Sequence, residues 1–199
     1  MKRKPLEGLS PTRMRDESMI IVNRIEHILQ HKEFYAPNNW KLWLSLGLVI
    51  KSLIFLITCF AGYQSSPATD PIWLNSFGIC TGDCESYLEP AENFVQNGKY
   101  TPDYRMPGYG MFYIVFRLLF NQNSSANMLI ILQLFLDIVA SYSIGVIALH
   151  LTKQKAAFYW AFGLYCLSAT ISSFNNFFLT ESLTASLLVF SAYFLVRHL

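Results

Sequence analysis

The residues best suited to chemistry lie in a polar loop, residues 81–110, between two apolar stretches of the chain. The loop opens with two carboxylates, Asp83 and Glu85, and ends with Arg105 in the run Arg-Met-Pro-Gly-Tyr. Another acidic residue, Glu181, follows a later apolar stretch. A carboxylate held within reach of a reacting hydroxyl can take its proton as a general base. We therefore expect the active site in this loop.

Each of these residues also has a structural interpretation. Asp83 precedes a helix-compatible run with apolar residues at helical spacing, which Gly98 ends, and aspartate is a good N-cap. Glu181 precedes another apolar helix, where a negative charge is favourable at the N-terminus. Arg105 fits an ordinary cation at a membrane interface. The residues taken one by one leave both interpretations open.

The composition predicts an all-α polytopic membrane protein. The chain has 199 residues, of which 53% are hydrophobic and 16% aromatic, and its mean hydropathy is +0.31. A hydrocarbon layer of about 30 Å is crossed by about 20 apolar residues in a helix, and several segments reach that length. The formal net charge of +2 gives no support for nucleic-acid binding.

Four membrane spans are expected after a basic cytoplasmic tail, residues 1–41. Within this tail, residues 16–31 fit either an amphipathic helix on the membrane surface or a partly ordered segment. The expected spans are about residues 42–63, 127–151, 156–174 and 182–199, and the first outer loop is 64–126. Residues 107–120 would extend only about 21 Å as a helix, which is short for a span.

The distribution of basic residues decides the side on which each loop lies. If residues 107–120 form a surface helix, the basic N-terminus, Lys153, Lys155 and Arg197 all face the cytoplasm, as the positive-inside tendency requires. We therefore expect a helix along the outer interface there, with both chain ends inside the plasma (inner) membrane. This topology puts Asp83 and Glu181 on the same outer face.

Two charged residues fall inside expected spans. Lys51 in the first span either faces the helix bundle or indicates that the span is shifted or tilted, since a charge at that depth is costly. Asp137 lies near the middle of the second span, where we expect it to hydrogen-bond to a Ser or Tyr of a neighbouring span.

The four cysteines do not form a disulfide scaffold, but two of them share the polar loop. Cys80 and Cys84 can pair if the loop faces an oxidising compartment. Cys59 and Cys166 lie in apolar segments, where cysteine behaves as a small hydrophobe. Asn123-Ser-Ser fits a glycosylation sequon and is expected on the outer side.

The order of these motifs resembles a family. GDCESYLEPAENFVQNGKY, then YRMPGYG, then a long span, a short basic turn, another span and LTESL are similar to the start of a GT-C membrane glycosyltransferase. The resemblance is to the branch with protein O-mannosyltransferase-like, aminoarabinose-transferase-like and bacterial Rgt-type enzymes. It covers about residues 42–199, which corresponds to the N-terminal portion of such an enzyme.

The resemblance implies a hexosyl- or pentosyltransferase that moves a sugar from a polyprenyl-phosphate donor to a lipid, glycan or protein acceptor. It implies that Asp83 is the catalytic base, that Glu181 is a second catalytic acidic residue, and that Arg105 binds the donor phosphate. The match at Arg105 is imperfect because Met106 separates it from Pro107. A divalent cation would suit two carboxylates, but two ligands do not establish a metal.

Two other classes of function compete with this one. A non-catalytic small membrane subunit, or a lipid-binding or assembly protein, would tolerate Asp83→Asn and Arg105→Ala, whereas a transferase would not. A transporter is less well supported, because the sequence has no apparent inverted repeat and no pair of Gly/Pro-broken spans.

Overall fold

The structure is a computed structural model that describes residues 37, 39–65, 77–79, 84–101, 108–178 and 180–198. The helix expected in residues 16–31 lies outside these residues. The described part of the chain is helical, without a strand; an isolated bridge joins Ile79 to Phe177. The helices are α2 (Trp40–Ser65), α3 (Cys84–Asn97), α4 (Gly108–Arg117), α5 (Gln122–Thr152), α6 (Lys155–Leu167), α7 (Ala169–Ser173), the 3-10 turn η1 (Phe174–Asn176) and α8 (Thr180–His198).

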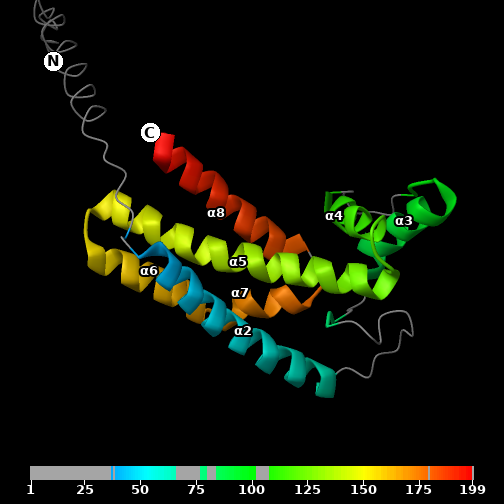
Figure 1. Ribbon diagram of the computed structural model, residues 1–199, viewed down its shortest axis with the longest axis horizontal. Helices are drawn as coiled ribbons and strands as arrows, with labels where there is room; N and C mark the ends of the chain where they lie inside the picture. The colour runs from blue at the N-terminus through cyan, green and yellow to red at the C-terminus, as the bar shows by residue number, and fades with distance from the viewer. Residues whose placement is uncertain are drawn as a thin grey trace, which may run out of the picture. The chain divides into compact units, whose positions relative to one another are not determined.

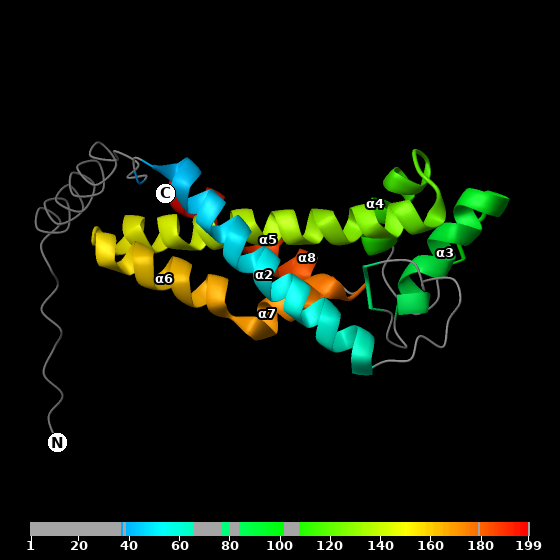
Figure 2. The same cartoon turned by 60° about the horizontal axis from the view of Figure 1, so that its bottom comes forward.

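Helix α5 is the centre of the bundle. It packs against α2, α6 and α8, and successive long helices run in opposite directions (Figures 1 and 2). The turn from α5 to α6 and the end of α8 lie at one end of the bundle, and α3 and α4 lie at the other (Figure 1). The long helices therefore place the two expected outer connections at the same end.

Two helices in the described part of the chain, α2 and α5, are long and apolar enough to cross a membrane. Helix α5 has 31 residues and so extends about 46 Å. Helix α6 has 13 residues, about 20 Å, and α8 has 19 residues, about 28 Å. The expectation of a helical, membrane-associated protein is thus supported, whereas the number of four spans is not confirmed.

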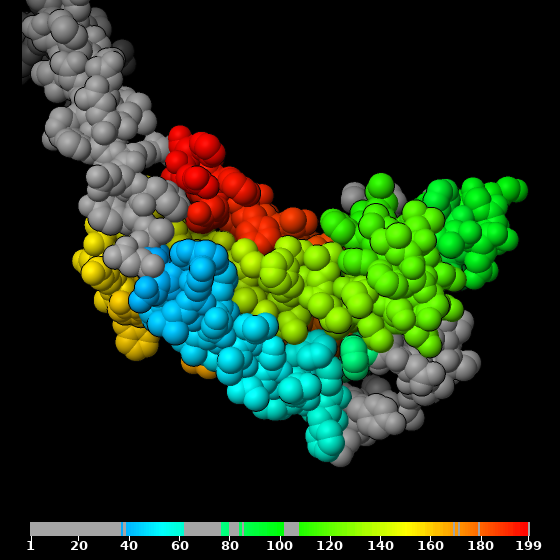
Figure 3. Space-filling view, in the orientation of Figure 1, coloured from blue at the N-terminus to red at the C-terminus, as the bar shows by residue number. Residues whose placement is uncertain are grey.

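Helix α2 exposes apolar residues over most of its surface and lies beside α5 on the face seen in Figure 3. Gly47 and Lys51, one helical turn apart, are buried on its inner side. The large exposed apolar residues of α2 are Trp40, Leu42, Leu46, Leu48, Val49, Leu53, Leu56, Ile57 and Phe60. A helix with this outer surface fits contact with lipid better than contact with water.

The third expected span, residues 156–174, is not one continuous helix. Helix α6 ends at Leu167, Ser168 adopts an extended conformation with ψ 96°, and α7 starts at Ala169. At the break the carbonyl of Tyr165 accepts from the backbone N–H of Ser168 at 3.3 Å, and the ammonium of Lys51 donates to the same carbonyl at 3.1 Å. The interruption therefore supplies a hydrogen-bond acceptor to a buried cation.

Close packing between α5 and α6 depends on Gly145. A Cβ atom at this position would lie 2.7 Å from Cε2 of Phe158 and 3.2 Å from Cβ of Phe162. The rings of Phe158 and Phe162 are stacked, with centroids 5.9 Å apart, and the Trp43 ring of α2 packs against both. This aromatic cluster fastens α2 and α6 together beside α5.

Helices α3 and α4 agree with their sequence patterns. Helix α3 ends where Gly98 takes a left-handed conformation, φ 69°, and α4 has only 10 residues, too few to span a membrane. Glu92 of α3 accepts hydrogen bonds from Arg117 at 2.8 Å and from the hydroxyl of Tyr113. This half-buried ion pair joins α3 to α4. That α4 lies along the outer membrane interface stays a prediction.

Candidate functional site

The structure describes one of the three expected site residues. Asp83 and Arg105 lie outside the described residues. Glu181 is in the first turn of α8, and its side chain is exposed. Cys84, which follows Asp83 in the sequence, is the first residue of α3 and is fully buried.

The start of α3 and the start of α8 belong to one packed cluster. The hydroxyl groups of Tyr87 and Thr180 lie 3.5 Å apart, and the rings of Tyr87 and Tyr109 meet edge to face at 5.5 Å. Apolar residues of α3, α4 and the first turns of α5 pack together with Phe178 and Leu183 around these contacts. The neighbours of Asp83 and of Glu181 in the sequence are thus brought together.

Tyr109 connects this cluster to α5 through a hydrogen bond, and the negative charge of Glu181 affects its pKa. Its hydroxyl donates to Oε1 of Gln133 at 3.2 Å, and Nε2 of Gln133 donates to the carbonyl of Phe177 at 3.4 Å. Burial, and then the negative charge of Glu181, raise the pKa of Tyr109 well above its ordinary value. Tyr109 is therefore neutral under physiological conditions and acts as a hydrogen-bond donor to Gln133.

A second polar cluster lies inside the bundle and contains both charges found in the expected spans. Nζ of Lys51 is 2.9 Å from Oδ2 of Asp137, and the two side chains are 0% and 1% exposed. The same ammonium donates to Oγ of Ser172 at 2.8 Å and to the carbonyl of Tyr165. Its three N–H donors therefore have three acceptors, and the ring of Tyr165 lies 4.8 Å from Nζ.

Asp137 is hydrogen-bonded to residues beyond the ion pair. Nδ2 of Asn175 donates to Oδ2 of Asp137 at 2.7 Å, and the hydroxyl of Ser182 donates to Oδ1 of Asn175. Next to them, Nδ2 of Asn176 donates to Oγ1 of Thr58 on α2. The cluster therefore ties α2, α5, η1 and α8 together at one level of the bundle.

The structure decides between the alternatives for the two buried charges. Lys51 faces the bundle and is paired, so a shift of the first span is not needed to explain it. Asp137 bonds within the bundle, as expected: the hydroxyl of Tyr165 on the neighbouring helix α6 interacts with its carboxylate. Its closest partners, Lys51 and Asn175, were not predicted. Nothing in the sequence singled out Ser172 and Ser182, and the Asn175-Asn176 pair resembled a polar break between spans.

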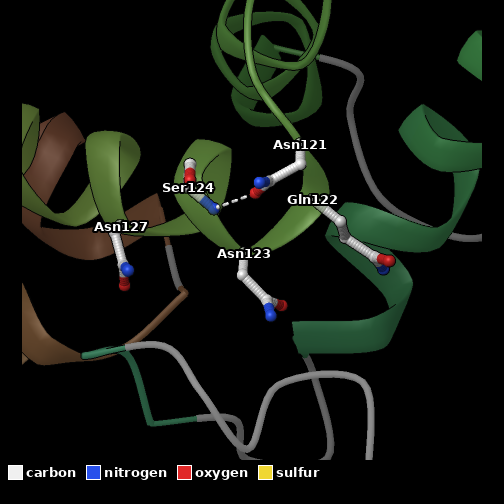
Figure 4. A pocket seen from close by; sticks show the side chains of 5 residues that line it. All are labelled: Asn121, Gln122, Asn123, Ser124 and Asn127. Carbon is white, nitrogen blue, oxygen red and sulfur yellow. Dashed lines mark hydrogen bonds between the residues drawn. The ribbon is translucent and has the colours of Figure 1, made fainter.

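A polar cavity of about 380 Å³ opens at the start of α5 (Figure 4). Amide side chains line it, and Asn121 caps α5 by accepting from the backbone N–H of Ser124 at 2.9 Å. Asn123 of the glycosylation sequon is half-buried there. The hydroxyl of Ser125 in the same sequon is fully buried and donates to the carbonyl of Asn121 at 2.8 Å. In the folded chain the hydroxyl of the sequon is therefore already hydrogen-bonded to the backbone at the start of α5.

Over the described ranges, no group of three or more His, Cys, Asp or Glu side chains could hold a metal ion. Cys84 is disulfide-bonded, and its expected partner, Cys80, lies outside those ranges. Cys59 and Cys166 are free thiols, in agreement with their apolar surroundings.

Comparisons with protein-family models, with curated proteins and with solved structures find no match for this chain.

Proposed function

We propose that this chain is the N-terminal part of a GT-C-type glycosyltransferase, which moves a sugar from a polyprenyl-phosphate donor to an acceptor on the outer face of the membrane. The observation that carries the proposal is the packing of the start of α3 against the start of α8. The resemblance assigns acidic residues to both of these places, Asp83 and Glu181. The start of α3, which follows Asp83, and the start of α8, which carries Glu181, are far apart in the sequence but pack together. The proposed reaction needs acidic residues close to each other at such a place.

The arrangement of the helices supports the expected four-span topology. Helices α2, α5, α6 with α7, and α8 alternate in direction, so the outer connections share one end of the bundle (Figure 1). Basic residues gather toward the opposite ends of these helices: Lys41 at the start of α2, Lys153 and Lys155 between α5 and α6, and Arg197 at the end of α8. Basic residues at one end are typical of the cytoplasmic side.

The proposed reaction requires a base, a cation and a positioned acceptor. Asp83 takes the proton of the acceptor hydroxyl while its oxygen forms a bond to the anomeric carbon. The bond between that carbon and the phosphate oxygen breaks, and the phosphate leaves with the electron pair. Arg105 holds the leaving phosphate through paired N–H donors. Glu181 orients the acceptor or joins Asp83 in binding a divalent cation.

The test is transfer of labelled sugar from a panel of polyprenyl-phosphate donors in membranes. It uses the chain alone and the chain extended by any adjoining reading frame, each with Asp83→Asn and Glu181→Gln. Glu89→Gln is the matched control, since Glu89 is exposed on α3. A general base contributes about 10²–10⁴ in rate, and we expect Asp83→Asn to lose activity by this factor.

The control and the donor panel decide between the classes of function. Glu89→Gln should keep full transfer, and chelation of divalent cations shows whether a metal takes part. If neither form transfers sugar from any donor, the transferase proposal is wrong, and the non-catalytic membrane subunit takes its place. Normal transfer by Asp83→Asn would remove Asp83 as the base.

A further inference from the structure

The polar cluster inside the bundle ends next to a proposed catalytic residue. From Lys51 the contacts lead to Asp137, from Asp137 to Asn175, and from Asn175 to the hydroxyl of Ser182. Ser182 is 2% exposed and directly follows Glu181 in the first turn of α8. An unbroken series of buried contacts therefore connects the ion pair to the backbone that carries Glu181.

Each member of this series restricts the next one. An ion pair removed from water is costly to separate, so Lys51 and Asp137 hold a fixed geometry. Asn175 is fully buried and uses its amide N–H₂ toward Asp137 and its amide oxygen toward Ser182. A rotation of this amide would lose both bonds, and each lost bond would leave a buried polar group unpaired.

The carboxylate of Glu181 cannot be fixed by burial, because its side chain is exposed. Its position therefore depends on the first turn of α8. The contact between Tyr87 and Thr180 supports that turn on the outer side, at a long distance of 3.5 Å. The bond between Ser182 and Asn175 supports it from inside the bundle.

We propose that Asn175 and Ser182 are positioning residues for Glu181, and that the Lys51–Asp137 pair is the fixed point from which they act. The claim that this positioning matters for catalysis rests on the proposed transferase function. The claim that Ser182 stabilises the first turn of α8 does not depend on any activity. The two parts can therefore be tested separately.

The test compares two serines of the same helix. Ser182→Ala removes the bond to Asn175, whereas Ser186→Ala, one turn later, removes a fully buried hydroxyl whose oxygen has no hydrogen-bond partner among the described residues. Both remove one oxygen atom from a buried site. A third variant, Ser182→Thr, keeps the hydroxyl and should restore the original behaviour.

The readout is hydrogen–deuterium exchange of the amides in the first half of α8, measured on the full chain in lipid nanodiscs. A hydrogen bond of about 1 kcal/mol corresponds to about fivefold faster exchange when it is lost. We expect this change in Ser182→Ala, and exchange close to that of the unaltered chain in Ser186→Ala and Ser182→Thr. Sugar transfer, measured in parallel, should fall only in Ser182→Ala, with kcat reduced more than KM changes.

The outcomes separate the two parts of the proposal. If Ser182→Ala exchanges like Ser186→Ala, the positioning role is wrong whatever the activity shows. If exchange rises as expected but no form of the chain transfers sugar, the positioning of α8 stands and the transferase function fails. If transfer is normal while exchange rises, Glu181 does not need to be positioned by this device.

Discussion

The ion pair between Lys51 and Asp137 gives the sharpest prediction of the fold. At a separation of 2.9 Å the Coulomb attraction is about 6 kcal/mol with an effective dielectric constant of about 20. Removing both charges from water costs several kcal/mol for each ion, so the net contribution of the intact pair is small. Removal of one partner is different, because it leaves a lone buried charge at a cost of about 3–5 kcal/mol.

The perturbation is a double-mutant cycle with Lys51→Met, Asp137→Leu and both together. Each single variant should lose about 3–5 kcal/mol, and the double variant should lose no more than either single one. The two single variants should cost similar amounts. Lys51→Met leaves the carboxylate with Asn175 and the hydroxyl of Tyr165, whereas Asp137→Leu leaves the ammonium with Ser172 and the carbonyl of Tyr165.

The assay is equilibrium unfolding by SDS in mixed micelles, followed by fluorescence. Trp43 is a suitable reporter, because its ring packs against Phe158 and Phe162 of α6 and should change its emission when α2 separates from α6. Lys41→Met is the matched control, since Lys41 is exposed on the same helix and its loss should cost less than about 0.5 kcal/mol. Additive losses in the double variant would refute the pairing of the two charges.

Two further predictions concern packing and alkaline pH. Gly145→Ala should destabilise the chain by about 1–3 kcal/mol in the same unfolding assay, since the ring of Phe158 is confined. Gly163→Ala, with nothing within 4 Å of the added Cβ, should be neutral or slightly stabilising. Burial raises the pKa of both Tyr109 and Tyr113, whereas the unfolded chain ionises its tyrosines near 10.0. The folded state then holds more protons above that pH, so stability should be intact below it and fall by about 1.4 kcal/mol per pH unit for each tyrosine above it. Tyr109→Phe should reduce this slope, and an unchanged slope would show that Tyr109 ionises freely in the folded chain.

The long helices could be predicted because their signal is local. About 20 apolar residues in a row define α2 and α5, and the basic turn at Lys153 marks the end of α5. The start of α5 was predicted too late, at residue 127, because the mostly polar residues 122–127 continue the helix from its cap at Asn121. The same reasoning identified residues 107–120 as too short to span. It did not find the break at Ser168, because residues 156–174 are apolar enough for a continuous helix, and the break is stabilised by Lys51, a residue of another helix.

The partners of the buried charges could not be predicted, because they depend on how the helices are rotated about their axes. Lys51 and Asp137 each appeared as an isolated charge in an apolar segment, and two such segments can meet with the charges facing each other or apart. Three residues of the cluster come from the least regular part of the bundle: Ser172 of α7, and Asn175 and Asn176 of η1. Ser172 lies 121 residues from Lys51 in the sequence, yet their side chains are 2.8 Å apart.

A polar stretch between two apolar segments can turn inside a helix bundle instead of emerging into water. In sequence, Asn175-Asn176 followed by Thr180-Glu181 resembles a connection that leaves the membrane into water. In the structure Asn175 and Asn176 are fully buried and bond to α5, α2 and α8. If this connection left the bundle, water would form the hydrogen bonds of the two side-chain amides. Because both amides are buried instead, the connection turns within the bundle. Glu181, a few residues later, is exposed because α8 begins at the edge of that buried turn.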